Sequence, residues 1–94
     1  MSDAKVLIVV GSLSDEARVE SAFKVLDEAN VAYDFVVSSA HRDPDKTAQI
    51  AKEASGNGYR VIIAGAGLAA ALPGAVAALT KIPVIGLPLD VGPL

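Results

Sequence analysis

The sequence predicts an α/β fold in which helices cover both faces of a parallel β-sheet. Short runs of β-branched residues recur along the chain, and segments with helical spacing separate them. Glycine-, proline- or serine-rich turns stand at the junctions. Strands that alternate with helices in this way form parallel sheets through right-handed crossovers. The 94 residues contain no linker and no internal repeat, so we expect one small domain over residues 1–94.

The first strand and helix show the clearest pattern. Val6–Val10 is an apolar run without alternation, which is typical of a strand buried on both faces. Residues 11–15 turn the chain, and Ser14 or Asp15 can cap a helix that continues to about Glu28. The buried side of this helix is expected to consist of residues at helical spacing, namely Val19, Ala22, Phe23, Leu26 and Ala29.

The rest of the chain repeats the alternation. Residues 32–37 predict a strand, and a polar loop then leads to a helix over residues 44–54. Asp43 suits the N-cap of that helix and Pro44 its first position, and Gly56-Asn-Gly58 ends it. The remaining expected elements are a strand over 61–64, a small-residue loop over 65–74, a short helix over 73–80 and a strand over 83–87.

The order of these elements predicts the topology of the sheet. We expect the flavodoxin-like strand order 2-1-3-4 in a three-layer αβα arrangement, with ligands beyond the carboxyl ends of the strands. The chain ends soon after the fourth strand, so the outer edge of that strand should be exposed or covered by a partner. A small, apolar chain without cysteine often gains burial by oligomerising, and we therefore expect a homo-oligomer.

The composition argues against several classes of function. The net charge is −3 and no basic stripe is present, which argues against nucleic-acid binding. With no cysteine and one histidine, no metal site is predicted. Residues 61–80 carry no charge, but Gly65, Gly67, Pro73 and Gly74 would interrupt a membrane-spanning helix. No signal-peptide pattern is found, so we expect a cytoplasmic protein without membrane contact.

The turn after the first strand offers donors at a helix N-terminus. Gly11, Ser12 and Ser14 supply backbone amides and hydroxyls, and Asp15 can accept hydrogen bonds from a ribose. Helix N-termini favour anions such as phosphate. The spacing matches neither a Walker loop nor a dinucleotide-binding fingerprint. These residues equally fit a tight turn that only caps a helix, and the loop by itself favours neither interpretation.

The other two loops also allow two interpretations each. His41, the single histidine, can shuttle a proton near neutral pH, and Arg42 can bind phosphate through two hydrogen bonds. A lone histidine in a loop is also common on ordinary protein surfaces. The glycine- and alanine-rich loop over residues 65–74 lets a flat ligand approach the backbone, or serves close packing of helix against sheet.

Taken together, the loops resemble those of the N5-carboxyaminoimidazole ribonucleotide mutase family, and the resemblance covers nearly the whole chain. The matching segments are Gly11-Ser-Leu-Ser-Asp15, Ser39-Ala-His-Arg42 with Pro44-Asp45-Lys46, Asn57-Gly-Tyr59, Val61-Ile-Ile-Ala-Gly-Ala-Gly67, Leu72-Pro-Gly74 and Pro83-Val-Ile-Gly86.

The resemblance implies an enzyme of purine biosynthesis that acts on aminoimidazole ribonucleotide. In that reaction a carboxyl group would move from the exocyclic nitrogen to a ring carbon, with CO2 held by the enzyme between the two steps. The resemblance implies no metal or organic cofactor. It also implies assembly as an octamer. His41 matches the catalytic histidine of the family. The matching substrate positions are Ser12, Ser14 and Arg42 for phosphate, Asp15 for ribose, and Ser39, Ala40, Ala66, Gly67 and Leu72 for the base and CO2 pocket, with Gly11 as a further substrate-binding residue of the first loop.

The sequence departs from the family pattern at two residues and in its length. Leu68 stands where the family carries glycine, and Ala71 stands where a second histidine is common. Family members also continue with a further strand and helices. The shortened tail and Ala71 favour an alternative, a catalytically inactive or truncated phosphate- or nucleotide-binding module of the same fold. A second alternative is a carboxylase of pyridinium-type cofactor synthesis, and the segments 39–42 and 57–59 favour the mutase over it.

Overall fold

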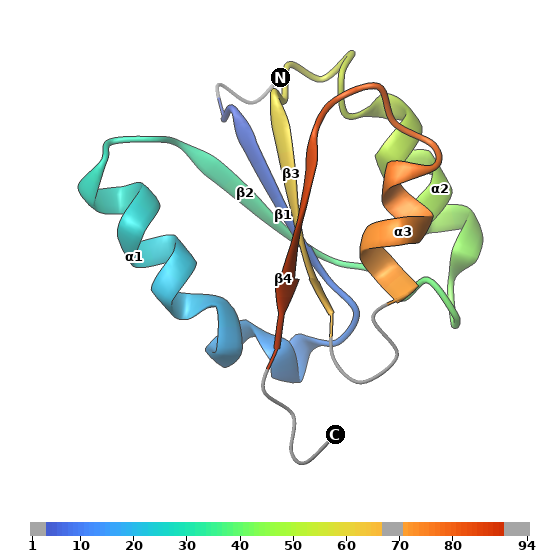
Figure 1. Ribbon diagram of the computed structural model, residues 1–94, viewed down its shortest axis with the longest axis horizontal. Helices are drawn as coiled ribbons and strands as arrows, with labels where there is room; N and C mark the ends of the chain where they lie inside the picture. The colour runs from blue at the N-terminus through green and yellow to red at the C-terminus, as the bar shows by residue number, and fades with distance from the viewer. Residues whose placement is uncertain (1–3, 67–70, 90–94) are drawn as a thin grey trace.

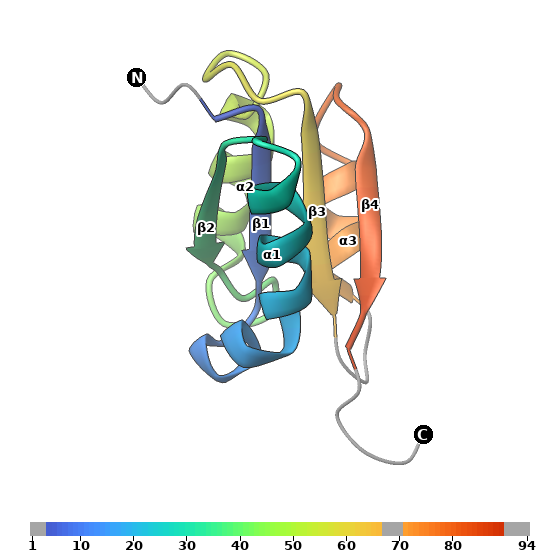
Figure 2. The ribbon, with the colours of Figure 1, turned by 90° about the vertical axis from the view of Figure 1, so that its left-hand side faces the viewer.

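Four parallel strands form one sheet in the computed structural model, which describes residues 4–66 and 71–89. Helices lie on both faces of the sheet, with α1 on one side and α2 and α3 on the other (Figure 1, Figure 2). The predicted three-layer, flavodoxin-like arrangement with strand order β2-β1-β3-β4 is confirmed. The elements are β1 (Val6–Val10), the 3-10 helix η1 (Leu13–Val19), α1 (Glu20–Glu28), β2 (Tyr33–Val37), α2 (Pro44–Glu53), β3 (Val61–Ala66), α3 (Ala71–Ala77) and β4 (Val84–Pro88).

The central strand β1 is buried along its whole length. Val6 pairs with Tyr33 of β2 and with Val61 of β3, and the same register continues to Val10. Alternate side chains of β1 enter two separate hydrophobic clusters, because successive residues of a strand point to opposite faces. Leu7 and Val9 pack toward α2 and α3, whereas Val6, Ile8 and Val10 pack toward α1. Burial on both faces explains why the run shows no alternation.

The segment after β1 differs from the prediction of one helix. It forms η1 first, and α1 begins only at Glu20. The N-cap is Ser12, whose hydroxyl accepts from the Ser14 amide, so the prediction of Ser14 or Asp15 as cap is wrong. Ser12 has the extended backbone that an N-cap requires (φ −149°, ψ 145°), and the chain turns directly after it.

The buried side of this helical segment is largely as predicted. Val19 is completely buried, and Phe23 and Leu26 are half-buried against the cluster on the α1 face. The Phe23 ring stacks on that of Tyr33 with centroids 5.2 Å apart. Ala29 is exposed, contrary to the prediction, because α1 ends at Glu28 and Ala29 is only its C-cap.

The boundaries of α2 follow the predicted signals. Asp43 is the N-cap, its carboxylate accepts from the Lys46 amide at 3.2 Å, and Pro44 is the first helical residue. After the helix, the Tyr59 amide donates to the Ala54 carbonyl at 3.2 Å. Gly58 makes this reversal possible with φ +93°, a backbone conformation that glycine adopts far more easily than other residues.

The second half of the sheet has boundaries shifted by one to three residues from the prediction. β3 continues to Ala66 because its pairing with β4 extends to Pro88, and α3 begins at Ala71 instead of residue 73. Gly65 is closely surrounded, since a Cβ placed there would lie 3.1 Å from Val10 Cγ1. Glycine therefore serves packing at this position.

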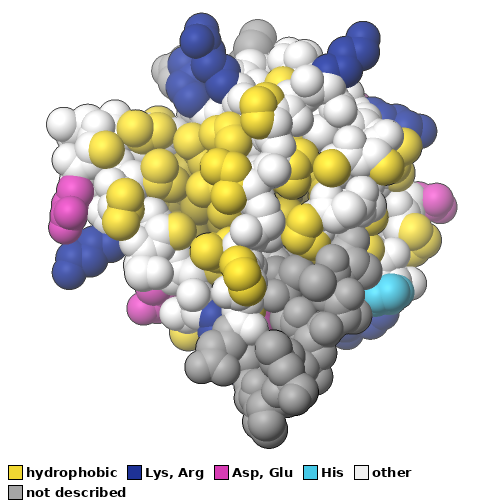
Figure 3. All heavy atoms as spheres, in the orientation of Figure 1, with side chains coloured by type: hydrophobic (Ala, Val, Ile, Leu, Met, Phe, Trp, Pro, Cys, Tyr) yellow, Lys and Arg dark blue, Asp and Glu magenta, His cyan; other side chains and the backbone are white. Residues whose placement is uncertain are grey.

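The outer strand β4 leaves apolar surface exposed among the described residues. Ile85 is 54% exposed, and Leu87 is half-buried. Among the described elements, η1 and α1 lie over this face of the sheet, and Figure 3 shows a band of hydrophobic side chains between α1 and β4. β4 is the outermost strand of the described sheet on this side, as the predicted strand order requires. None of the described helices is long and apolar enough to cross a membrane.

A polar contact joins β2 to the segment before β3 near the amino ends of the strands. The Tyr59 hydroxyl donates a hydrogen bond to the Asp34 carboxylate. Burial of the phenol, followed by this bond and the negative charge of Asp34, raises the pKa of Tyr59 to about 12. The pair lies at the opposite end of the sheet from the loops after β1 and β2.

We expect Gly58→Ala to lower the free energy of unfolding by about 1 kcal/mol, because a side chain disfavours the positive φ at this position. Urea denaturation measures the change. Gly56→Ala is the matched control, since a Cβ there would meet only the Glu53 carbonyl oxygen at an ordinary 3.6 Å. Equal loss of stability in both variants would contradict the role given to the Gly58 conformation.

We expect Tyr59→Phe to destabilise the fold by about 1 kcal/mol at pH 7 to 9 through loss of the hydrogen bond. The pKa of Tyr59 is raised in the folded state, so this contribution is complete below pH 10 and is lost as the pH rises toward 12. Urea denaturation of both proteins between pH 7 and 12 should therefore show their stabilities converging. A constant difference over that range would contradict the assignment.

Candidate functional site

The three loops singled out from the sequence begin at the same edge of the sheet. Because all four strands are parallel, their carboxyl ends lie together, and Figure 1 shows η1 and the N-terminal ends of α2 and α3 at that edge. The Ser38 amide donates to the Val10 carbonyl at 2.8 Å, which fixes the start of the second loop beside the first. This edge is where open α/β sheets bind ligands.

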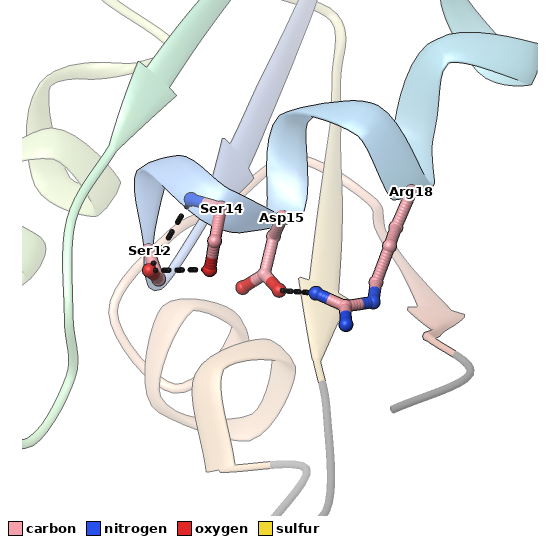
Figure 4. Close-up of polar contacts among 4 residues, drawn as sticks. All are labelled: Ser12, Ser14, Asp15 and Arg18. Carbon is pink, nitrogen blue, oxygen red and sulfur yellow. Dashed lines mark hydrogen bonds and ion pairs between the residues drawn. The ribbon is translucent and has the colours of Figure 1, made fainter. Parts of the chain in front are cut away.

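The first loop brings two serine hydroxyls together. Ser12 Oγ lies 3.0 Å from Ser14 Oγ and accepts from the Ser14 amide at 3.4 Å (Figure 4). Both side chains are accessible, Ser14 being exposed and Ser12 half-buried. Among the described residues, no atom lies within 4 Å of a Cβ built on Gly11, so these residues leave an opening beside the loop. Hydroxyls and backbone amides in such an opening can bind the oxygens of an anion.

The predicted ribose contact, Asp15, is held by a cation that the sequence analysis missed. The Arg18 guanidinium donates to Asp15 Oδ1 at 3.1 Å, as Figure 4 shows, and the two side chains are 39% and 16% exposed respectively. Residues three apart are eclipsed in a 3-10 helix, so η1 aligns this pair. The spacing of the two charges was visible in the sequence, but the 3-10 geometry was not.

The second loop forms a compact turn that exposes its two candidate residues. Ser39 Oγ accepts from the Arg42 amide at 3.0 Å, and the Ser39 carbonyl accepts from the Asp43 amide at 3.0 Å. His41 and Arg42 are exposed between these bonds, and Ala40 is half-buried. The turn therefore presents an imidazole and a guanidinium to solvent from a backbone held by hydrogen bonds at both ends.

Three residues that anchor this turn were absent from the predicted site. Ser38 and Thr47 are each 3% exposed, and their hydroxyl oxygens lie 2.6 Å apart. Lys46 Nζ donates to the Val37 carbonyl at 2.8 Å. A hydroxyl at the end of a strand and another in the first turn of the next helix were the available signal, but only the packing of α2 on the sheet shows that they meet.

The third loop is described only at its two ends. Ala66 is the last residue of β3, and Leu72 lies in the first turn of α3. Leu72 is 5% exposed and packs in the core beside Ala64 and Val76, so its side chain contributes to the hydrophobic cluster. Gly67, a predicted pocket residue, and Leu68, a departure from the family pattern, lie outside the described residues.

A groove between α2 and α3 continues from the second loop. Its volume is about 410 Å3, and Ala40 lies at its border with the turn that carries His41. The other lining residues are mainly small or apolar, namely Pro44, Thr47, Ala48, Ala75, Ala78 and Leu79, and Asp45 also lines the groove. Among the described residues, no cluster of three histidine, cysteine, aspartate or glutamate side chains could hold a metal ion.

Comparison with known proteins finds similar sequences over nearly the whole chain. Residues 5–94 match the family model described as AIR carboxylase. The N5-carboxyaminoimidazole ribonucleotide mutase of Haemophilus influenzae is 54% identical over 86 residues, which cover 92% of this chain and 52% of that protein. The enzyme of the same name from Escherichia coli strain K12 is 51% identical over 87 residues, covering 93% of this chain and 52% of that protein.

A eukaryotic protein is also similar. The phosphoribosylaminoimidazole carboxylase of Schizosaccharomyces pombe is 51% identical over 82 residues, which cover 87% of this chain and 15% of that protein. The chain thus spans about half the length of the two bacterial mutases. Because the family model matches nearly every residue, including both described loops, the chain belongs to the AIR carboxylase family.

Proposed function

We propose that this chain provides the carboxyl-transfer site for aminoimidazole ribonucleotide in de novo purine biosynthesis, and that it converts N5-carboxyaminoimidazole ribonucleotide to 4-carboxy-5-aminoimidazole ribonucleotide. One observation carries the proposal. The single histidine lies in a hydrogen-bonded turn at the carboxyl edge of the sheet, where the loop of serine hydroxyls and Asp15 also begins. Membership of the AIR carboxylase family supplies the class of reaction.

The first loop and Arg42 would bind the ribose phosphate. The hydroxyls of Ser12 and Ser14, the backbone at Gly11 and the Arg42 guanidinium offer donors suited to phosphate oxygens. Asp15 would accept hydrogen bonds from the ribose hydroxyls. Its ion pair with Arg18 holds the carboxylate in place, so one oxygen can bond the sugar while the other contacts Arg18.

His41 would act as general acid and then as general base. The carboxyl group leaves the exocyclic nitrogen as CO2, and that nitrogen takes a proton from the His41 imidazolium. The ring carbon then attacks CO2, and the neutral imidazole removes the proton from this carbon, which restores the imidazolium. One histidine is sufficient because a single proton is shuttled. No metal or organic cofactor takes part in the proposed route.

The base and CO2 would lie over small residues beside His41. Ser39 and Ala40 flank the turn, Ala66 ends β3, and Leu72 supports the start of α3 from the core, with Gly67 as a further proposed contact. A small, water-poor pocket would keep CO2 near the ring carbon. The proposed enzyme is a cytoplasmic homo-oligomer, for which the family resemblance suggests an octamer, and the apolar surface of β4 is consistent with association.

We expect His41→Ala to lower kcat for carboxyl transfer at least 100-fold, because general acid–base catalysis typically contributes about 10²- to 10⁴-fold. The measurement is conversion of N5-carboxyaminoimidazole ribonucleotide by purified protein. Lys52→Ala, an exposed change in the last turn of α2, should retain full turnover. Undiminished turnover in His41→Ala would refute the assigned role. Absence of turnover in the unmodified chain would favour the ribonucleotide-binding alternative.

We expect Arg42→Ala to weaken ribonucleotide binding by roughly 10- to 150-fold, the effect of losing a charge-assisted hydrogen bond of about 1.5–3 kcal/mol. Titration calorimetry with aminoimidazole ribonucleotide measures the affinity. Arg60→Ala is the matched control, because Arg60 is also an exposed arginine and precedes β3 at the opposite end of the sheet. If the two variants bind alike, Arg42 does not contact the phosphate.

A further inference from the structure

Two consecutive residues in the first turn of α2 hold two consecutive residues at the end of β2. Lys46 Nζ donates to the Val37 carbonyl at 2.8 Å, and the Thr47 and Ser38 hydroxyl oxygens lie 2.6 Å apart. Ser38 and Thr47 are the two buried polar residues in the part of the chain that the structure describes. Burying a polar side chain costs free energy unless the side chain is hydrogen-bonded. The two hydroxyls are therefore expected to keep one hydrogen-bonded arrangement.

The direction of the buried hydrogen bonds follows from the number of protons available. Thr47 Oγ1 donates to the Asp43 carbonyl at 3.1 Å, and a hydroxyl has one proton to give. Ser38 must therefore donate to Thr47. The result is a directed chain from the Ser38 hydroxyl through Thr47 to the Asp43 carbonyl, which joins the two ends of the segment 38–43 through one buried side chain.

His41 lies within the segment that this chain of hydrogen bonds closes. On one side of it, Ser38 is also attached to β1 through its amide, and on the other, the Asp43 amide donates to the Ser39 carbonyl. The imidazole itself is exposed. Its place relative to the first loop therefore depends on the backbone of the segment 38–43, and that backbone depends on Lys46 and Thr47.

We propose that Lys46 and Thr47 are positioning residues that hold His41 where its imidazole can exchange a proton with the substrate. This inference rests on the proposed function. Neither residue needs to touch the substrate, because both act through the backbone of the turn. A displacement of about 1 Å at a reacting group can lower the rate about 100-fold, so even small movements of this turn should lower kcat.

The test compares variants that remove the bonds with variants that keep them. Thr47→Val preserves the branched shape and removes both hydroxyl bonds, whereas Thr47→Ser retains the hydroxyl. Lys46→Met keeps most of the side-chain stem without the donor, and Lys52→Met is its control on the same helix. We expect kcat for N5-carboxyaminoimidazole ribonucleotide to fall about 10-fold in Thr47→Val and in Lys46→Met, with KM within about 2-fold. Thr47→Ser and Lys52→Met should keep the original kcat.

A second measurement does not depend on turnover. The chain has one histidine, so its imidazole carbon–proton signal in an NMR spectrum reports on His41 alone. We expect this signal to shift, broaden or double in Thr47→Val and Lys46→Met, and to match the original in Thr47→Ser and Lys52→Met. Exchange of the Arg42 backbone amide proton with solvent should accelerate about 10-fold in Thr47→Val and Lys46→Met. The backbone amide of Val9, a buried core residue, should show no comparable change.

The two measurements separate failure of this inference from failure of the proposed function. An unchanged His41 signal and unchanged kcat in Thr47→Val and Lys46→Met would overturn the positioning role even if His41→Ala is inactive. If neither the unmodified chain nor any variant turns over the substrate, the carboxyl-transfer proposal fails, and the positioning role in catalysis fails with it. A perturbed His41 signal accompanied by full turnover would show that the bonds hold the turn without serving the reaction, and would also overturn the inference.

Discussion

Parallel pairing of β1 with both of its neighbours is the constraint on which the rest of the structure depends. The strand is buried throughout, and its register with β2 and β3 is continuous from Val6 to Val10. Parallel pairing places the carboxyl ends of all the strands at one edge, so the loops after β1 and β2 must start side by side. The same pairing requires a helical crossover between strands, which supplies the helix N-terminus that follows each loop.

The candidate site combines exposed chemical groups with buried anchors. His41 and Arg42 are exposed, yet the turn that carries them is attached to the core through Ser38 and Thr47. The first loop is built differently, because contacts within η1 organise Ser12 and Asp15 near the surface. A proton-transfer group needs a fixed position, whereas an anion can be held by several adjustable donors. This contrast is consistent with the proposed proton transfer by His41 of the second loop and with phosphate binding shared between the first loop and Arg42.

The apolar side chains exposed on β4 can be compared with the length of the relatives in the AIR carboxylase family. The chain spans about half the length of the bacterial mutases that it matches, yet it contains both described loops of the candidate site. The described part leaves Ile85 of β4 exposed and Leu87 half-buried. The groups proposed for binding and proton transfer thus lie within this chain, while the apolar surface of β4 is a feature that further protein could cover.

The sequence by itself determined the order of elements, because each strand and helix follows from a pattern local to its segment. The strand order and the meeting of the loops at one edge followed from the general rule for alternating strands and helices. The N-cap at Asp43 and the glycine turn at Gly58 were also predictable from local patterns. Only the tertiary structure decided the 3-10 course of η1 and the contact between Ser38 and Thr47. Residues nine positions apart meet there because α2 packs on the sheet, and no local pattern specifies such a contact.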